Sequence, residues 1–361
     1  MKVAQAMLQE GHELLLLGFA PLAEFAGGDL CRFYGLEIAP QVHTFEAPRR
    51  LFPYLAFWKA LGWRPDLIYT WAPQVAVLGL LVGKPVVLEA HLLPSGLVGP
   101  LWYRLFALLP GKKRLASVTQ ALYRLLQERH HLHMDSEVVI APNGVDLERF
   151  ADLPSPSQSR ARLALPEKMT VLCSGHLYAG RGAALFLELA ARFPAVHFLW
   201  VGGRSRELEY WRTRVAAQKL ENVTFYGFVP NEQLPLFLAA ADILLMPYEQ
   251  KIGISSGDID SSEIASPMKM FEYMAAGRPI LASDLPVLRE VLDEKTAVFC
   301  PPNEAGSWEK ALEQLLADAM LRSRLGEEAK WRARAYTWRE RARRILQGSE
   351  TWAKQALTNT F

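Results

Sequence analysis

The chain has 361 residues, of which 50% are hydrophobic and 22% charged, and its 40 basic and 38 acidic residues give a net charge of +2. This length suits two hydrophobic cores better than one, and the composition excludes a disordered chain. The near balance of charge excludes a generally basic nucleic-acid-binding protein, so we expect no nucleic-acid partner.

Three cysteines lie far apart, at Cys31, Cys173 and Cys300. Their odd number and wide spacing predict neither a disulfide framework nor a metal cluster, and free thiols suit a reducing cytosol. The first residues lack the apolar core of a signal peptide. The uncharged run at 67–83 is shorter than the roughly 20 residues of a membrane-spanning helix. We therefore expect a cytoplasmic protein.

The first half of the chain alternates helical stretches with short apolar runs. Residues 3–8 predict a helix ahead of the first apolar run. An open α/β domain normally begins with a strand, so we expect that strand to be missing from this sequence. Short apolar runs bounded by Gly, Pro or charge predict the strands of a parallel sheet. These runs are 14–18, 67–70, 86–89, 115–118 and 138–140.

Residues 152–159 are rich in Pro and Ser, which predicts an extended linker rather than a helix. The alternation then restarts, with strands predicted at 170–174, 196–201, 223–226, 243–246 and 279–282, and helices at 183–193, 234–241, 268–276 and 308–318. A helical tail follows Trp338, and its arginines predict a solvated face: Arg339, Arg341, Arg343 and Arg344.

The predicted fold class is α/β, with two doubly wound Rossmann-like domains. We place the first at 1–150 and the second at 160–337, and expect the helix within 338–361 to pack back toward the first domain. Ligands of such sheets bind at the carboxyl ends of the strands, beside helix N-termini.

A glycine-rich turn, Ser174–Gly182, follows one predicted strand and precedes a helix. Glycines allow the backbone to approach an anion, and Arg181 and His176 can reach a diphosphate. A planar guanidinium that stays charged suits phosphate oxygens. Taken alone, the turn is more typical of an ordinary strand-to-helix connection with a solvated arginine.

The segment Ser266–Pro279 predicts a second anion-binding helix. Pro267 fits the first helical position and Ser266 the N-cap before it. Ser266, Lys269 and Glu272 recur every three residues and share one helix face. Such a face could hold a phosphate and a ribose diol, and the alternative is a capped amphipathic surface helix.

Ser266–Gly277 resembles the donor-binding element of the retaining GT-B glycosyltransferases of family 4, which often reads Ser-Pro-x-Lys-x-Phe-Glu-Tyr-Met-Ala. Further segments typical of that family occur in its order, at Gly11–Glu13, Pro142–Asp146, Ser174–Gly182, Val201–Gly203, Asn222–Val229 and Ala241–Pro247. The resemblance implies a GT-B fold, whose two Rossmann-like domains face a central cleft. It also implies sugar transfer from a nucleotide-sugar donor to an acceptor, which could be a glycan, a lipid-linked sugar or a small molecule.

The resemblance also assigns site residues. Arg181 matches the family's usual Lys at the donor diphosphate, Glu272 the Glu that holds the ribose, and His91 the first-domain His near the transferred sugar. The implied catalytic residues are His91, Arg181 and Glu272. The implied diphosphate-binding residues are Gly175, His176, Arg181, Ser266, Pro267, Met268 and Lys269. The implied nucleoside-binding residues are Gly202, Phe228, Val229 and Glu272.

The chain departs from the family pattern at Ile264, where the first Glu of the family's Glu-x7-Glu pair would fall, with Glu263 beside it. We expect no metal and no other cofactor. Metal-dependent transferases hold a cation with carboxylates, and Asp258-Ile259-Asp260 is a weak candidate for this task. Arg181, Lys269 and helix N-termini would instead compensate the charge of the diphosphate.

The sequence alone also allows other functions to be considered. A nicotinamide-dependent oxidoreductase would need Gly-x-Gly-x-x-Gly after a strand, and Gly202-Gly203 lacks that spacing. A nucleotide-sugar epimerase and a non-catalytic relative both remain alternatives. The apolar segment Leu97–Leu109 and the basic Lys112–Arg114 after it suit peripheral contact with the inner face of a membrane. A helix packed on the first-domain sheet explains them equally well.

Overall fold

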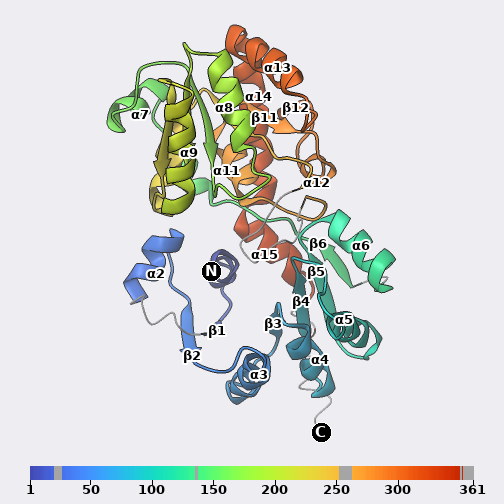
Figure 1. Ribbon diagram of the computed structural model, residues 1–361. Coiled ribbons are helices and arrows are strands. Elements are labelled where there is room, and N and C mark those ends of the chain that lie inside the picture. The colour runs from blue at the N-terminus through green and yellow to red at the C-terminus, as the bar shows by residue number, and fades with distance from the viewer. Residues whose placement is uncertain (20–26, 135–136, 252–261, 350–351, 353–361) are drawn as a thin grey trace. The chain divides into compact units, whose positions relative to one another are not determined.

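The computed structural model describes residues 1–19, 27–134, 137–251, 262–349 and 352. The chain divides into two compact units (Figure 1). The first unit comprises residues 1–143 and 338–361, and the second comprises residues 144–337. In the described ranges, no helix combines the length and the apolar character that crossing a membrane requires.

Two parallel sheets form the centre of the first unit. The main sheet has the order β3-β4-β5-β6, with β3 (Ile68–Thr70), β4 (Val86–Ala90), β5 (Lys113–Ser117) and β6 (Val138–Ile140). The second sheet pairs β1 (Leu15–Phe19) with β2 (Gln41–Phe45). Strand β4 is buried along its whole length, as expected for a central strand of a parallel sheet.

The helices of the first unit are α1 (Lys2–Gln9), α2 (Gly27–Tyr34), α3 (Phe52–Gly62), α4 (Pro73–Leu81), α5 (Gly99–Leu108), α6 (Gln120–His130) and α15 (Trp338–Leu346). Helix α1 precedes the first strand, as the sequence predicts. Helix α15 packs against α1, so two distant stretches of the sequence build one unit.

Helix α15 buries one face, and this corrects a prediction. The buried residues are Trp338, Arg341, Ala342 and Ile345. Their spacing of three and four residues is that of a single helix face. Arg341 is only 3% exposed, so the predicted solvated face is wrong for this residue. Arg339 and Arg343 do lie on the exposed side, where both form ion pairs with Glu10.

One sheet of six parallel strands organises the second unit, in the order β12-β11-β10-β7-β8-β9. The strands are β7 (Thr170–Ser174), β8 (His197–Val201), β9 (Val223–Gly227), β10 (Ile243–Met246), β11 (Ile280–Ser283) and β12 (Ala297–Cys300). Counted from β7, this is the 3-2-1-4-5-6 order of dinucleotide-binding folds. The order reverses between β7 and β10, and sheets of this kind bind ligands at that point.

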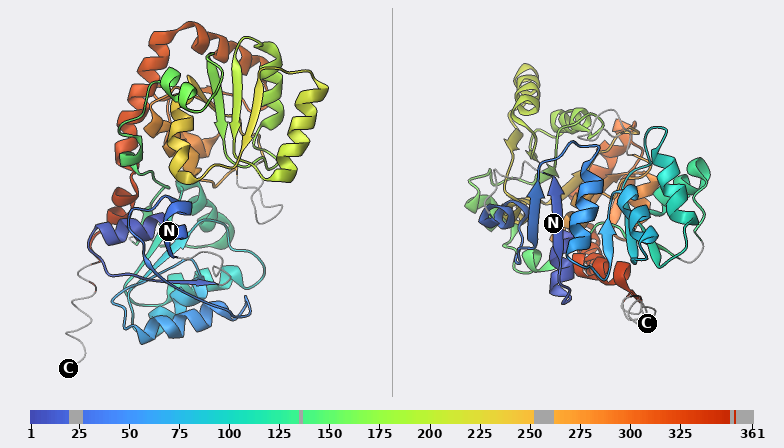
Figure 2. Two further views of the ribbon diagram at one scale, coloured as in Figure 1. Left: turned by 90° about the vertical axis from the view of Figure 1, so that its left-hand side faces the viewer. Right: turned by 90° about the horizontal axis from the view of Figure 1, so that it is seen from below.

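Helices cover both faces of this sheet (Figure 2). The helices are α7 (Pro156–Arg162), α8 (Ala183–Arg192), α9 (Ser205–Ala217), α10 (Leu234–Ala240), α11 (Met268–Ala276), α12 (Pro286–Arg289), α13 (Ala305–Ala317) and α14 (Ala319–Ala333). Short 3-10 helices occur at Leu147–Phe150, Asn231–Gln233 and Arg334–Tyr336. On one face, Phe186 of α8 packs edge-on against Phe198 and Trp200 of β8, and Trp308 of α13 joins the same core.

The predicted linker at 152–159 is wrong, because a helix begins inside it. Ser155 caps α7: its side chain accepts the N–H of Gln158, whose side chain accepts the N–H of Ser155 in return. Pro156 then occupies the first turn, where a missing N–H costs nothing. Helix α7 packs against α10 within the second unit, and the chain passes between the units earlier, at Asn143–Gly144.

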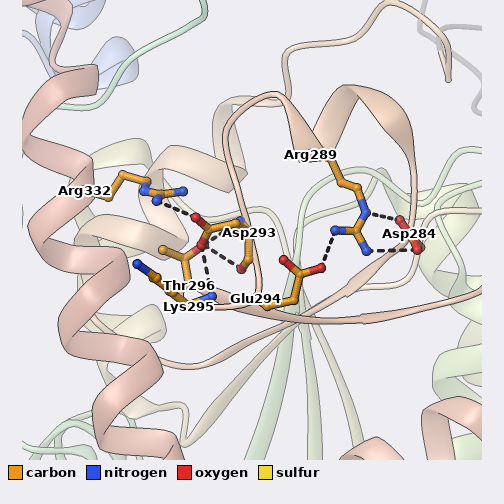
Figure 3. Close-up of polar contacts among 7 residues, drawn as sticks. All are labelled: Asp284, Arg289, Asp293, Glu294, Lys295, Thr296 and Arg332. Atoms are coloured by element: carbon orange, nitrogen blue, oxygen red, sulfur yellow. Dashed lines mark hydrogen bonds and ion pairs between the residues drawn. The ribbon is translucent and has the colours of Figure 1, made fainter.

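Ion pairs beyond β11 fix the turn around α12 (Figure 3). Arg289 lies between Asp284 and Glu294, and Arg332 of α14 contacts Asp293. The side chains of Arg289 and Asp284 are 37% and 42% exposed. Exposed pairs of this kind contribute at most about 1 kcal/mol. We therefore assign this group the structural task of fastening the turn to α14.

His197 at the start of β8 predicts a loss of stability in acid. The residue is 2% exposed, and its Nε2 lies 3.0 Å from Thr224 Oγ1. Burial, followed by the positive charges of Lys168 and Arg160, lowers its pKa from 6.5 to about 4. Below pH 6.5 this histidine binds a proton in the unfolded chain, whereas in the folded chain it stays neutral down to about pH 4. The stability that this group contributes is therefore fully present above about pH 6.5 and is lost as the pH falls toward about 4.

Acidification from about pH 7 to about pH 4.5 should remove about 2 kcal/mol through this group, as measured by urea unfolding. The His197→Gln variant keeps a polar side chain but cannot take up the proton, so it should lose less stability over the same range. Equal losses in the two proteins would contradict the assignment.

Candidate functional site

The site of the second unit begins at the carboxyl ends of β7, β8 and β9. The N–H of Gly175 donates to Val201 O at 2.8 Å, and the N–H of Gly202 donates to Gly227 O at 2.7 Å. Gly202 has φ +114°, and a Cβ there would lie 2.5 Å from Gly175 O. Only glycine fits this approach, which brings the three strand ends into one continuous backbone surface.

Two positive side chains meet on one aromatic ring at the reversal point between β7 and β10. Tyr248, which follows β10, is 1% exposed. Arg181 Nη1 donates to the Tyr248 hydroxyl at 2.9 Å, and its guanidinium carbon lies 5.1 Å from the ring centre. Lys269 Nζ lies 4.6 Å from the same centre. The structure thus brings together Arg181 and Lys269, which are distant in the sequence.

Lys269 is also bound to the end of β7. Its Nζ donates to Ser174 O at 3.1 Å, directly before Gly175. The same Nζ lies 3.7 Å from Cys173 Sγ. Burial raises the pKa of that thiol despite the nearby lysine, so the sulfur stays protonated and unreactive. Lys269 therefore supplies a positive charge beside the glycine-rich turn.

Tyr273 positions the helix that carries Lys269. Its hydroxyl accepts the N–H of Ser174 at 2.7 Å and donates to Leu245 O at 3.4 Å. These bonds join α11 to both strands at the reversal point. Burial raises the pKa of Tyr273 well above 10.0, so the hydroxyl keeps its proton.

Helix α11 starts one residue later than predicted. Pro267 has an extended backbone, with ψ 124°, and is the N-cap rather than the first helical residue. The predicted N-cap, Ser266, therefore lies outside the helix. Met268 is the first helical residue and is 42% exposed, so the start of α11 reaches the surface of the second unit beside Lys269. A helix N-terminus next to a lysine attracts anions.

His176 differs from the two cations. Its ring stacks on Tyr178 with 4.8 Å between the ring centres. Burial against the loop, together with the positive charges of Arg204 and Arg181, lowers the pKa of His176. The neutral imidazole is therefore favoured at neutral pH, and it offers a hydrogen bond rather than a positive charge.

The remaining predicted residues of the second unit differ in exposure. Glu272, on the second turn of α11, is 7% exposed. Phe228, after the end of β9, is 64% exposed, and Val229 beside it is half-buried. Ile264, at the position of the missing carboxylate, is 3% exposed and therefore belongs to the core. An apolar side chain there can offer a sugar no hydrogen bond.

His91 belongs to the first unit and directly follows β4. Its Nε2 lies 2.7 Å from Oε1 of the buried Glu89, and its side chain is 36% exposed. The ring meets Trp71 edge to face, with 5.1 Å between the ring centres. The His91 ring is therefore fixed by Glu89 and Trp71, while part of its side chain remains accessible to solvent.

Sequence reasoning missed three residues that organise these surfaces: Tyr248, Tyr273 and Glu89. A tyrosine directly after the fourth strand of the Rossmann order was a usable signal, because ligands bind at that position. A carboxylate inside the apolar run at 86–89 was another, because buried charges need partners.

No group of three or more His, Cys, Asp or Glu that could hold a metal occurs in the part of the chain that the structure describes. The candidate Asp258-Ile259-Asp260 lies outside the described residues.

Two family models match the chain, one for each half. Residues 1–149 match Glycosyltransferase Family 4, and residues 168–318 match Glycosyl transferases group 1. The phosphatidyl-myo-inositol mannosyltransferase of Mycolicibacterium smegmatis is 31% identical over 60% of this chain and 53% of its own length. The D-inositol 3-phosphate glycosyltransferase of Xylanimonas cellulosilytica is 27% identical over 57% and 49%. The chain spans about half the length of these relatives.

Solved structures resemble the chain over nearly its whole length. Anabaena HepE in complex with UDP has a TM-score of 0.74 at 17% identity and covers 98% of this chain and 96% of its own. A glycosyltransferase from Rickettsia africae has a TM-score of 0.77 at 14% identity and covers 99% and 94%. With a family model matched in each half and solved structures similar over nearly the whole length, the chain belongs to the family 4 (group 1) glycosyltransferases and has their GT-B fold.

Proposed function

We propose that the chain is a retaining, metal-independent glycosyltransferase that moves a sugar from a nucleotide-sugar donor to an acceptor hydroxyl. The observation that carries this proposal is the meeting of Arg181 and Lys269 on the Tyr248 ring. Two positive charges beside a helix N-terminus and a glycine-rich turn suit a diphosphate. The neighbour HepE, which was solved with UDP and with UDP-glucose, supports a donor of this class.

In this proposal Arg181 and Lys269 compensate the charge that builds up on the departing diphosphate. The bond between the sugar's anomeric carbon and the donor phosphate breaks, and the acceptor oxygen bonds to that carbon from the same side. The departing phosphate takes the acceptor proton. Glu272 would hold the ribose hydroxyls, and His91 the transferred sugar. Fixed charges in a partly desolvated site stabilise such a transition state more than water does.

Turnover in the presence of a chelator tests the proposed reaction. Purified protein is screened for transfer or slow hydrolysis of UDP-, GDP- and ADP-sugars, and the active donor is assayed with and without EDTA. We expect activity to be unchanged by EDTA, because two side chains supply the charge that a metal would. Activity that vanishes with EDTA and returns with Mn²⁺ would contradict the metal-independent mechanism.

Ile264 favours a second candidate, a protein that binds nucleotide-sugars without turning them over. This residue is buried where the family pattern has a sugar-contacting carboxylate. Such a protein would still be stabilised by its donor, by about 2.7 kcal/mol at a hundredfold excess over Kd. Stabilisation without any turnover across the donor series would favour this candidate over the transferase.

Peripheral membrane contact is a further part of the proposal. Helix α5 buries Phe106 but exposes Leu101 and Leu108, which are 52% and 81% exposed. Exposed apolar side chains beside basic residues can enter the interface of anionic lipids. Of the basic residues Lys112–Arg114, Lys113 does not contribute to this contact, because its Nζ donates to carbonyls at the end of α5.

We expect the protein to co-sediment with vesicles that contain anionic lipid, and Leu108→Ser to weaken this binding. Met320→Ser, which changes an equally exposed side chain (84%) in the second unit, is the matched control and should bind as the wild type does. Failure of the wild type to co-sediment would end the proposal of membrane contact.

A further inference from the structure

The first unit contains a carboxylate in an unusual place. Glu89 lies within β4, whose five residues are all buried, and is itself 2% exposed. Transfer of a charged carboxylate into a protein core is costly unless partners compensate it. A strand that only had to fill the sheet would carry an apolar residue at this position.

Four side chains converge on the two oxygens of Glu89. The hydroxyl of Tyr69 and the indole N–H of Trp71 donate to Oε2, the latter at 3.2 Å. Arg341 Nη2 donates to Oε1, and His91 Nε2 lies 2.7 Å from the same oxygen. An ionised carboxylate accepts about four hydrogen bonds. Three hydrogen bonds and the close contact of His91 therefore surround the two oxygens.

The charge of Glu89 is balanced by Arg341. Burial by itself would raise the pKa of the Glu89 carboxyl, but the contacts with His91 and Arg341 outweigh it and the pKa lies below its ordinary value. Arg341 is held in turn, because its Nε donates to Ala141 O at 3.2 Å and to Pro142 O at 3.0 Å. Arg341 as a whole is only 3% exposed, so its guanidinium cannot turn away into solvent.

An ionised carboxylate at 2.7 Å decides which ring nitrogen of His91 carries the proton. A carboxylate without a proton repels a nitrogen lone pair at this distance and attracts a protonated nitrogen, so the proton is favoured on Nε2. In the neutral ring Nδ1 is then unprotonated and acts as the acceptor. Trp71, which packs edge-on against the ring while its N–H is bound to Glu89, restricts the ring further.

We propose that Glu89 and Arg341 are positioning residues for His91. The Glu89 carboxylate, neutralised by Arg341 of α15, keeps the proton on Nε2 and leaves Nδ1 as the nitrogen that meets a ligand. His91 can then accept a hydrogen bond from a sugar hydroxyl through Nδ1. The inference rests on the proposed function in one respect, that His91 contacts the transferred sugar.

The first test reads the ring directly and needs no activity. The full chain is labelled with ¹⁵N, and the His91 ring signals are assigned by their loss in His91→Gln. In spectra recorded at a pH where the ring is neutral, we expect the proton on Nε2 and none on Nδ1. In Glu89→Gln and in Arg341→Gln the Nδ1-protonated form should increase. A wild-type ring protonated on Nδ1, or folded variants with an unchanged ring, would overturn the proposal.

The second test asks whether Glu89 acts through His91. With the active donor, Glu89→Gln should lower kcat by about 10- to 100-fold, the range for groups that orient a functional side chain. In the His91→Gln background the same change should have no further effect, since its target is gone. Equal losses in both backgrounds would show that Glu89 only supports the fold, and would overturn the proposal.

Arg343→Gln is the matched control. It removes an arginine from the same helix that also pairs with a carboxylate, Glu10, but the Arg343 side chain is 54% exposed. This variant should keep the wild-type ring spectrum and kcat. If no donor is turned over at all, the proposed function fails, while the wild-type ring spectrum still decides the role of Glu89. A change of the ring in Arg343→Gln equal to that in Arg341→Gln would contradict a specific role for Arg341.

Discussion

Arg181→Ala is expected to lower kcat about 10²- to 10³-fold, the loss seen when one preorganised group is removed from a developing negative charge. The guanidinium rests on the Tyr248 ring, which Lys269 also contacts, at the reversal point between β7 and β10. Lys269→Ala should cause a loss of similar size. Donor turnover by the purified variants is the measurement.

Two further variants separate charge from folding. Arg181→Lys keeps a positive charge at the position where the family usually has lysine, so it should restore most of the activity. Arg192→Ala removes an arginine from α8 whose side chain is 65% exposed and paired with Glu309, and it should leave turnover unchanged. Full activity of Arg181→Ala would refute the assignment of this residue to the diphosphate.

Gly182→Ala is expected to destabilise the second unit by about 3 kcal/mol or more, through overpacking and backbone strain together. Gly182 is the N-cap of α8 with φ +79°. A Cβ at this position would lie 1.7 Å from Pro247 O and 2.7 Å from Pro247 C. Because both contacts are with backbone, either the start of α8 or the end of β10 must move. Urea unfolding measures the loss.

Two other glycines of the same unit dissect this effect. Gly175 also has a positive φ, +120°, but nothing lies within 4 Å of an added Cβ. Gly175→Ala should therefore cost only the backbone strain, about 1–2 kcal/mol. Gly306 in α13 has neither feature, so Gly306→Ala should be neutral or slightly stabilising. Equal effects of Gly182→Ala and Gly306→Ala would contradict the close approach of α8 to Pro247.

The sequence predicts best the elements that are buried on both faces. The bounds predicted for β7 and β10 are those of the structure. Strands covered by two helical layers must be continuously apolar, and this leaves a clear signal between polar turns. Strand β2 was not predicted, because three of its five residues are exposed. Its sequence therefore lacks the apolar run on which the prediction depends.

The functional site could likewise be predicted from the sequence only in part. The anion-binding character of 174–182 and 266–277 is local, since it depends on glycines and a helix start within each segment. The pairing of Arg341 with Glu89 joins residues 252 positions apart. Nothing within α15 itself distinguishes Arg341 from its neighbouring arginines except its place among Trp338, Ala342 and Ile345. Contacts of this range follow from the fold and not from a motif.

The return of α15 to the first unit has a consequence on the ribosome. The second unit is one continuous stretch and is complete once residue 337 has been synthesised, whereas the first unit must wait for Leu346. At about 5–20 residues per second, the roughly 200 residues after Asn143 take on the order of 10–40 s. During that interval the nascent chain contains Glu89 without Arg341. We therefore expect the second unit, which is made later, to be completed before the first during translation.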